Sequence, residues 1–111
     1  MPPITYSAST FQAVVNGSNV TVQIKPGTTT TRPVVWIGLC DQDTTPNEWP
    51  NPLPTNPSYV KYQQEVTVSN GTWSHPFTGV SSDTYVVVVI PKDPDAKVAA
   101  EKDHVNDVAV P

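Results

Sequence analysis

The chain has 111 residues, of which 37% are hydrophobic, and its formal net charge is −4 at pH 7. This length fits one core, so we expect residues 1–111 to form a single domain. The chain has six Lys and Arg against ten Asp and Glu. This acidic balance argues against binding to nucleic acid, which needs a basic stripe, and against binding to an anionic membrane surface. No apolar run reaches the roughly 20 residues that span a bilayer, so we expect no membrane insertion.

The composition favours strands over helices. The chain holds 18 Val but only 2 Leu and 6 Ala, and β-branched side chains suit a pleated sheet. Its 13 Pro exclude long helices almost anywhere. We therefore expect an all-β chain.

The first part of the chain reads as short strands joined by turns. Residues 4–9 predict a first strand, and residues 11–15 a second strand with one apolar face. The Asn-Gly pair within residues 16–19 is typical of a tight hairpin turn. Residues 20–25 alternate strictly between apolar and polar side chains, which indicates a half-buried strand. The threonines at 28–31 predict an extended edge or a loop.

The middle of the chain holds the most apolar segments. Residues 34–39 are apolar on both faces and predict a central strand. Residues 60–68 alternate again, and a second Asn-Gly turn at 69–72 leads into a returning strand at 73–77. Residues 84–90 are the most β-prone run, which must be buried to avoid aggregation.

The last part predicts the only helix. Asp93 fits an N-cap and Pro94 the first helical position, which places a short helix over residues 95–102. Residues 104–110 predict a final strand in which Val105 and one of the two later valines point inward.

This pattern of about seven short strands predicts a two-sheet antiparallel β-sandwich, immunoglobulin- or fibronectin III-like, with one short helix near the C-terminus. A small closed β-barrel is the alternative. The chain lacks the Cys–Trp–Cys spacing of true immunoglobulin domains, because Cys40 is its single cysteine. We expect Cys40 to be a buried small hydrophobe.

Residues 41–58 interrupt the pattern with five prolines and three asparagines. Proline has no backbone N–H to donate, so this many prolines prevent a regular ladder of β-sheet hydrogen bonds. Long irregular segments in a compact domain are usually functional or disordered. We interpret residues 41–58 as a proline-rich functional loop, ordered by its prolines.

Acidic, amide and aromatic side chains in and beyond this loop are typical of a sugar site. A flat aromatic ring stacks on the apolar face of a pyranose, while carboxylates and amides bind its hydroxyls. The candidate ligand-binding residues are Asp41, Asp43, Asn47, Glu48, Trp49, Asn51, Tyr59 and Tyr62, with Trp73 and His75 as a second group. The alternatives are that Trp49 plugs one end of the sandwich and that Trp73 and His75 belong to the core.

Metal binding and catalysis are both disfavoured. Asp41 and Asp43 are weak calcium candidates, since the segment lacks the third acidic position and the glycine of an EF-hand. The sequence holds no Gly-x-Ser-x-Gly elbow, His-Glu-x-x-His motif or glycine-rich phosphate loop. We expect no catalytic residues, no enzyme activity and no cofactor.

The sequence therefore predicts a non-catalytic, lectin-like carbohydrate-binding domain whose partners are glycans or glycoproteins. A homodimer or larger oligomer is expected, because single sugar sites bind weakly. One alternative is a structural or adhesive sandwich that pairs through an edge such as residues 28–32; another is a small inhibitor or toxin that acts through the proline-rich loop. We expect action outside the cell or at its surface, although the first residues carry no signal-peptide pattern.

Overall fold

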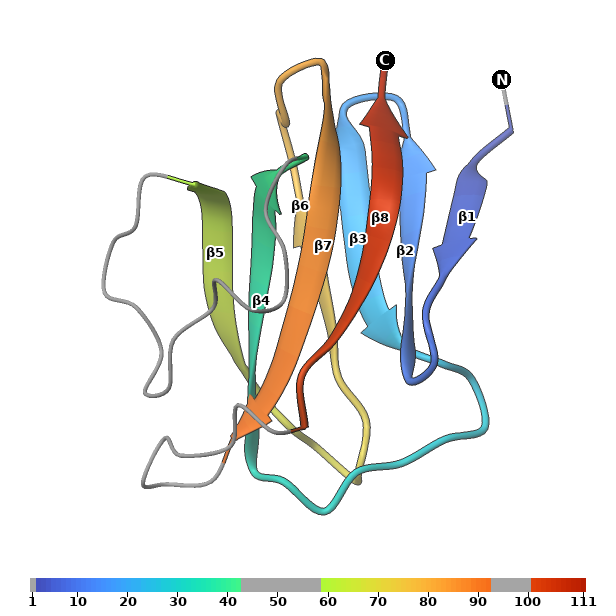
Figure 1. Cartoon of the computed structure of the whole chain (residues 1–111). Helices are drawn as coiled ribbons and strands as arrows, with labels where there is room; N and C mark the ends of the chain where they lie inside the picture. The colour runs from blue at the N-terminus through green and yellow to red at the C-terminus, as the bar shows by residue number, and fades with distance from the viewer. Residues whose placement is uncertain (1, 43–58, 93–100) are drawn as a thin grey trace.

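We describe a computed structural model, which defines residues 2–42, 59–92 and 101–111. These residues form eight strands in two antiparallel sheets packed face to face (Figure 1). The strands are β1 (Ile4–Ser7), β2 (Phe11–Asn16), β3 (Asn19–Ile24), β4 (Val34–Asp41), β5 (Val60–Thr67), β6 (Ser74–Phe77), β7 (Asp83–Lys92) and β8 (Asp103–Val110).

The sheets contain strands from different parts of the chain. One sheet has the order β1-β2-β3-β6 and the other the order β5-β4-β7-β8. The chain crosses between them after β3, after β5 and after β6. The two sheets do not close on each other, so the sandwich prediction is confirmed and the barrel alternative is wrong.

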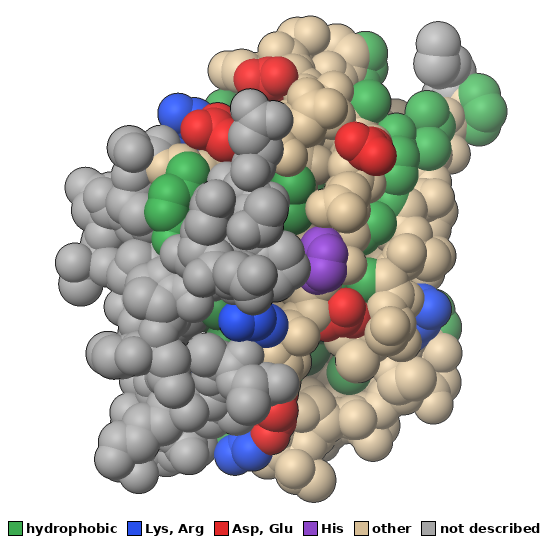
Figure 2. Space-filling model, in the orientation of Figure 1, with side chains coloured by type: hydrophobic (Ala, Val, Ile, Leu, Met, Phe, Trp, Pro, Cys, Tyr) green, Lys and Arg blue, Asp and Glu red, His purple; other side chains and the backbone are tan. Residues whose placement is uncertain are grey.

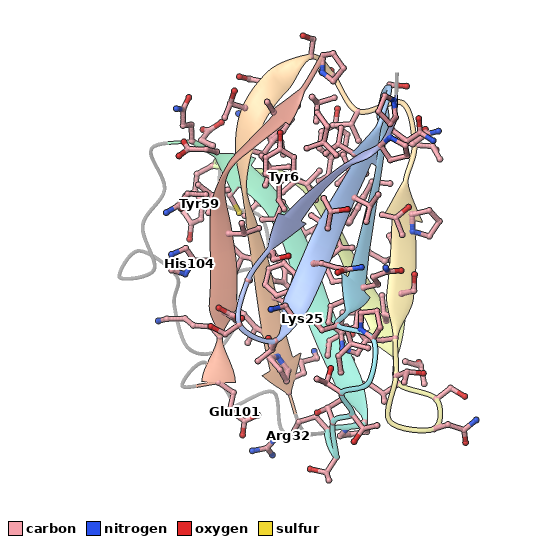
Figure 3. All side chains as sticks on the ribbon, turned by 90° about the vertical axis from the view of Figure 1, so that its right-hand side faces the viewer. Tyr6, Lys25, Arg32, Tyr59, Glu101 and His104 are labelled. Atoms are coloured by element: carbon pink, nitrogen blue, oxygen red, sulfur yellow. The ribbon has the colours of Figure 1, made fainter. Side chains whose placement is uncertain are left out.

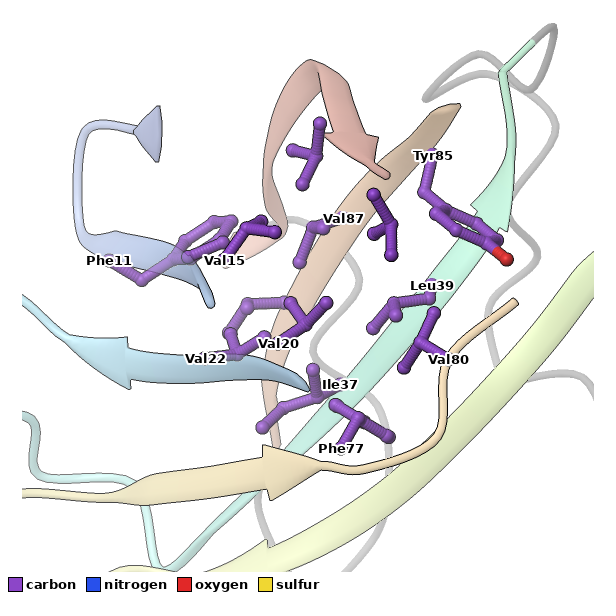
Figure 4. Packing of buried hydrophobic residues seen from close by; sticks show 14 of the residues in the cluster. Phe11, Val15, Val20, Val22, Ile37, Leu39, Phe77, Val80, Tyr85 and Val87 are labelled. Atoms are coloured by element: carbon purple, nitrogen blue, oxygen red, sulfur yellow. The ribbon is translucent and has the colours of Figure 1, made fainter. Parts of the chain in front are cut away.

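A hydrogen bond at the start of β7 fixes the entry of that strand. The hydroxyl of Tyr85 donates to the backbone carbonyl of Ser81 at 2.8 Å. This local arrangement is a tyrosine corner, a feature of immunoglobulin-type sandwiches. The ring of Tyr85 belongs to the core while its hydroxyl lies at the margin of the cluster (Figure 4).

The two Asn-Gly turns have different roles. In the first, Asn16 pairs with Asn19, and Gly17 supplies the positive φ of 62°. In the second, Asn70 and Gly71 both have positive φ, 56° and 77°, as a type I′ turn requires. This second turn does not lead to a hairpin partner of β5, because β6 pairs with β3 in the other sheet. The expectation of a returning strand beside residues 60–68 is therefore wrong.

The core lies between the sheets. Phe11, Ala13 and Val15 of β2 are buried, and β3 contributes Val20 and Val22. Fully burying a side chain of this kind contributes about 1.5–3 kcal/mol. Strands β4 and β7 are buried on both faces, as predicted for the central apolar runs.

A bulge in β8 changes which valines point inward. Val108 lies opposite Tyr85 and Val105 opposite Val87, so two residues face Val86. Asp107 takes the left-handed conformation (φ 58°) that this extra residue needs. Val108 and Val110 share one face of β8 and are both buried, and the bulge lets Val105 pack on the same core, whereas we had expected only one of the two later valines to point inward.

Two further expectations concern residues 28–32 and the predicted helix. Residues 28–32 form no strand, and the Thr30 amide donates to the carbonyl of Gly71 at 2.9 Å. That segment is a loop and not the edge strand that one adhesive alternative required. The predicted helix falls largely on residues 93–100, outside the described residues, and neither Glu101 nor Lys102 is α-helical.

Candidate functional site

The structure separates the predicted site residues into groups. Asp41, Tyr59 and Tyr62 lie at the end of the sandwich where β4 finishes, the upper end in Figure 1. Trp73 and His75 are in the other sheet, in or beside β6. The remaining candidates lie outside the described residues and stay predictions: Asp43, Asn47, Glu48, Trp49 and Asn51.

Asp41 and Tyr59 sit where β4 and β5 meet. The backbone amide of Asp41 donates to the carbonyl of Tyr59 at 2.8 Å. The register between the two strands shifts at Leu39 and Cys40. The Asp41 carboxylate lies 3.7 Å from the ammonium of Lys61, so an acid and a base stand together at this end.

Two tyrosines hold the segment before β7 in place. The Tyr62 hydroxyl accepts a hydrogen bond from the Ser81 amide at 3.0 Å and donates to the Ser81 hydroxyl at 3.3 Å. Tyr85 binds the carbonyl of the same serine. The two rings meet edge to face, with centroids 6.1 Å apart. Ser81 is thus fixed through its amide, its carbonyl and its side chain.

These groups surround a surface hollow of about 300 Å³, which we call the tyrosine hollow. It is lined by Lys61, Tyr62, Ser81, Asp83 and Tyr85. One carboxylate oxygen of Asp83 accepts a hydrogen bond from the backbone amide of Thr84 at 2.8 Å. The hollow therefore combines an ammonium, a carboxylate, hydroxyls and an aromatic ring within one small surface.

The two tyrosines differ in their electrostatics. Hydrogen bonds with the side chain and backbone of Ser81 lower the pKa of Tyr62. Burial, followed by the charges of Tyr62 and Asp83, raises the pKa of Tyr85. Tyr85 therefore stays a neutral hydrogen-bond donor at neutral pH, as its bond to a carbonyl requires.

Sequence reasoning had named Tyr62 but not the other residues of the hollow. Ser81 and Asp83 were not among the predicted site residues, and Tyr85 had been placed only in the buried β-prone run at 84–90. Their signal is local, a Ser-Ser-Asp turn followed by an aromatic residue. Their position beside Lys61 and Tyr62 depends on β4 pairing with both β5 and β7, which local patterns do not specify.

Trp73, His75 and Phe77 share the inner face of their segment. Trp73 is 6% exposed and its ring lies 6.5 Å from that of Phe11, while Phe77 is 7% exposed. His75 is half-buried with its ring edge-to-face on Phe77 at 4.6 Å. Burial lowers the pKa of His75, so its neutral form is favoured. These placements support the core interpretation for the aromatic residues.

The described residues offer no metal site or reactive thiol. Residues 2–42, 59–92 and 101–111 contain no group of three or more His, Cys, Asp or Glu that could hold a metal ion. Asp41 is described but Asp43, its proposed calcium partner, is not. Cys40 is fully buried, and burial together with Asp41 raises the pKa of its thiol to about 12. Its thiol is therefore protonated and inert at neutral pH.

The face of the molecule drawn in Figure 2 shows how the charged side chains are distributed there. In Figure 2, acidic and basic side chains are scattered over the visible face and do not gather into one charged patch. Within the described part of the chain, no helix has the length and apolar character needed to cross a membrane.

Comparison with protein-family models, with curated proteins and with solved structures gives no significant match. Function is therefore inferred from the described side chains alone.

Proposed function

We propose that this chain is a non-catalytic, lectin-like carbohydrate-binding domain and that the sugar lies in the tyrosine hollow. The observation that carries the proposal is the gathering of Lys61, Ser81 and Asp83 around the Tyr62 ring in one hollow of about 300 Å³. That volume is at the lower end of the range for small-molecule sites, about 300–1,000 Å³. One sugar ring is the ligand that suits it.

The chemistry of the hollow matches the two surfaces of a pyranose. The half-buried Tyr62 ring offers an aromatic surface to the apolar face of the sugar. Asp83 Oδ2 has no donor among the described residues and is available to accept from sugar hydroxyls. Lys61 donates to sugar oxygens from the other side.

The hollow is also organised before any ligand binds. Three hydrogen bonds with the two tyrosines hold Ser81, and the Asp83 side chain is anchored on the Thr84 amide. Side chains that are already ordered lose little entropy on binding, which favours association. A neutral polyhydroxylated ligand fits this mixture of donors and acceptors better than a strongly charged one.

The proposed partners are glycans or glycoproteins, and self-association would raise the avidity of a weak single site. The proline-rich loop begins at Asp41, beside the hollow, but residues 43–58 lie outside the described residues. A contribution of Trp49 to sugar binding therefore stays a prediction.

Calorimetric titration with a panel of monosaccharides and a glycan array, each with and without calcium, tests the proposal. We expect saturable binding of at least one sugar, and the Tyr62→Ala variant should abolish it. Asp83→Asn should weaken binding about tenfold, because a hydrogen bond to a charged group contributes about 1.5–3 kcal/mol.

Asp107→Asn is the matched control. It removes the same charge from an exposed carboxylate outside the hollow, and asparagine tolerates the left-handed backbone of Asp107. This variant should bind like the wild type. Absence of binding to every sugar, or equal losses in Asp83→Asn and Asp107→Asn, would overturn the proposal.

A further inference from the structure

Two buried tryptophans differ in one respect. Trp36 is 5% exposed, and its indole N–H donates to Gln63 Oε1 at 3.0 Å. Trp73 is 6% exposed, but its indole N–H makes no hydrogen bond with the described residues. A buried indole N–H usually has a partner. The missing acceptor for Trp73 therefore points to a group that binds beside it.

A cavity of about 330 Å³ adjoins Trp73 at the opposite end of the sandwich from the tyrosine hollow. Its lining includes the apolar residues Ile24, Val89 and Pro91 together with Trp73, and hydroxyl-bearing residues such as Thr10 and Thr29. The lining thus combines apolar side chains, a buried indole and several residues that carry hydroxyls. That combination is typical of a small-molecule site.

The rim of this cavity is held by contacts between distant segments. Thr10 donates its amide and its hydroxyl to Asp103 Oδ2, at 2.8 and 2.9 Å. The Thr30 amide donates to the carbonyl of Gly71. Arg32 and Glu101 form an ion pair and lie side by side at the lower end of the molecule in Figure 3. The cavity is therefore built into the fold and does not depend on one loose side chain.

Charge narrows the class of ligand. Glu101 is the one carboxylate among the described lining residues, and it is paired with Arg32. The chain as a whole has a net charge of −4. A cation finds no uncompensated carboxylate on this rim, and an anion meets an acidic protein, so a neutral ligand is favoured.

We propose that this cavity binds a small neutral ring compound whose carbonyl oxygen accepts the hydrogen bond of the Trp73 indole, as in a cyclic amide. The ring lies against the apolar walls, and the amide N–H of the ligand donates to a threonine hydroxyl on the rim. This site is separate from the proposed sugar site and holds whether or not the tyrosine hollow binds sugar.

The test is an NMR titration of the ¹⁵N-labelled full chain, observing the indole N–H signals, with 2-piperidone as the probe. We expect the Trp73 signal to shift saturably while the Trp36 signal stays in place. Cyclohexane, a neutral six-membered ring that lacks the carbonyl acceptor, should leave both signals unchanged. The chain has three tryptophans, and Trp36→Phe, Trp49→Phe and Trp73→Phe each remove one indole signal, so any two variants that fold assign all three signals.

Two isosteric variants locate the binding. Thr29→Val removes a rim hydroxyl of this cavity, and Thr67→Val removes one from a neighbouring hollow of about 470 Å³ that shares Trp73. We expect Thr29→Val to weaken 2-piperidone binding three- to tenfold and Thr67→Val to leave it unchanged. An unshifted Trp73 signal would mean that water alone satisfies the indole and would overturn the proposal. Equal shifts of both indoles, or a response of the Trp73 signal to cyclohexane equal to its response to 2-piperidone, would overturn it as well.

Discussion

The two ends of the sandwich differ in how their polar groups are hydrogen-bonded. At the tyrosine end, Tyr62, Tyr85 and Ser81 bind one another and form the wall of a surface hollow. At the tryptophan end, Trp73 is buried among apolar side chains, and its indole donor has no acceptor among the described residues. Under the two proposals, the first end binds an exposed polyhydroxylated ligand, and the second binds a ligand that accepts the hydrogen bond of the buried indole.

The largest expected effect is on stability, and it differs between the two ends because Trp73 is buried and Tyr62 is half-exposed. Trp73→Ala should destabilise the fold by about 3–5 kcal/mol, because it leaves a cavity beside Phe11. Tyr62→Ala should cost about 1 kcal/mol, since the ring is half-exposed. Urea unfolding midpoints measure both. Similar losses for the two variants would contradict the assigned difference in burial.

A pair of glycine variants isolates one contact at the tryptophan end. Gly71 and Gly17 both have positive φ, but only at Gly71 would a Cβ meet another side chain, that of Thr29, at 2.9 Å. A left-handed alanine costs about 1–2 kcal/mol in either position. Gly71→Ala should therefore unfold at lower urea concentration than Gly17→Ala. Equal midpoints would mean that the threonine loop moves aside freely.

The tyrosine corner gives an intermediate effect at the other end. Tyr85→Phe should cost about 1–3 kcal/mol, because the Ser81 carbonyl loses its donor beside the core. Tyr62→Phe should cost under about 1 kcal/mol, since water replaces its exposed hydroxyl. Thermal unfolding of the two single variants tests this order. A larger loss in Tyr62→Phe would show that Ser81 is held mainly from β5.

The smallest expected effect is a dependence of folding stability on pH. Burial lowers the pKa of His75 in the folded state, whereas the unfolded chain titrates near 6.5. Below pH of about 6.5 the unfolded state binds more protons, so stability is full above that pH and declines as the pH falls. Comparing wild type with His75→Gln from pH 7.5 to 5 measures the effect. Curves that stay parallel would contradict the assigned burial of His75.

The strands were predictable where a short-range pattern decides them. Residues 20–25 and 60–68 alternate as half-buried strands do, and the central apolar runs became β4 and β7. The Asn70-Gly71 turn has the predicted local geometry, yet its outgoing strand joins the other sheet. Local sequence determines the turn, whereas the choice of sheet depends on long-range packing.

The site was predictable only in part for the same reason. Asp41 and Tyr62 stood out as residues beside a disrupted segment, but Ser81 and Asp83 join them only through pairing across β4. The lack of an acceptor for the Trp73 indole N–H could not be predicted from the sequence, because it depends on where the surrounding side chains lie. Burial of Trp73 itself was one of the two alternatives that the sequence left open.

The most direct test of the central claim is a backbone-amide NMR titration of the ¹⁵N-labelled chain with the monosaccharide that binds best by calorimetry. If the tyrosine hollow is the sugar site, the amides of Lys61, Ser81 and Asp83 shift together and saturate, while the Trp73 indole signal stays fixed. Saturable shifts confined to the tryptophan end, or no saturable shift at any of the three amides, would contradict the account.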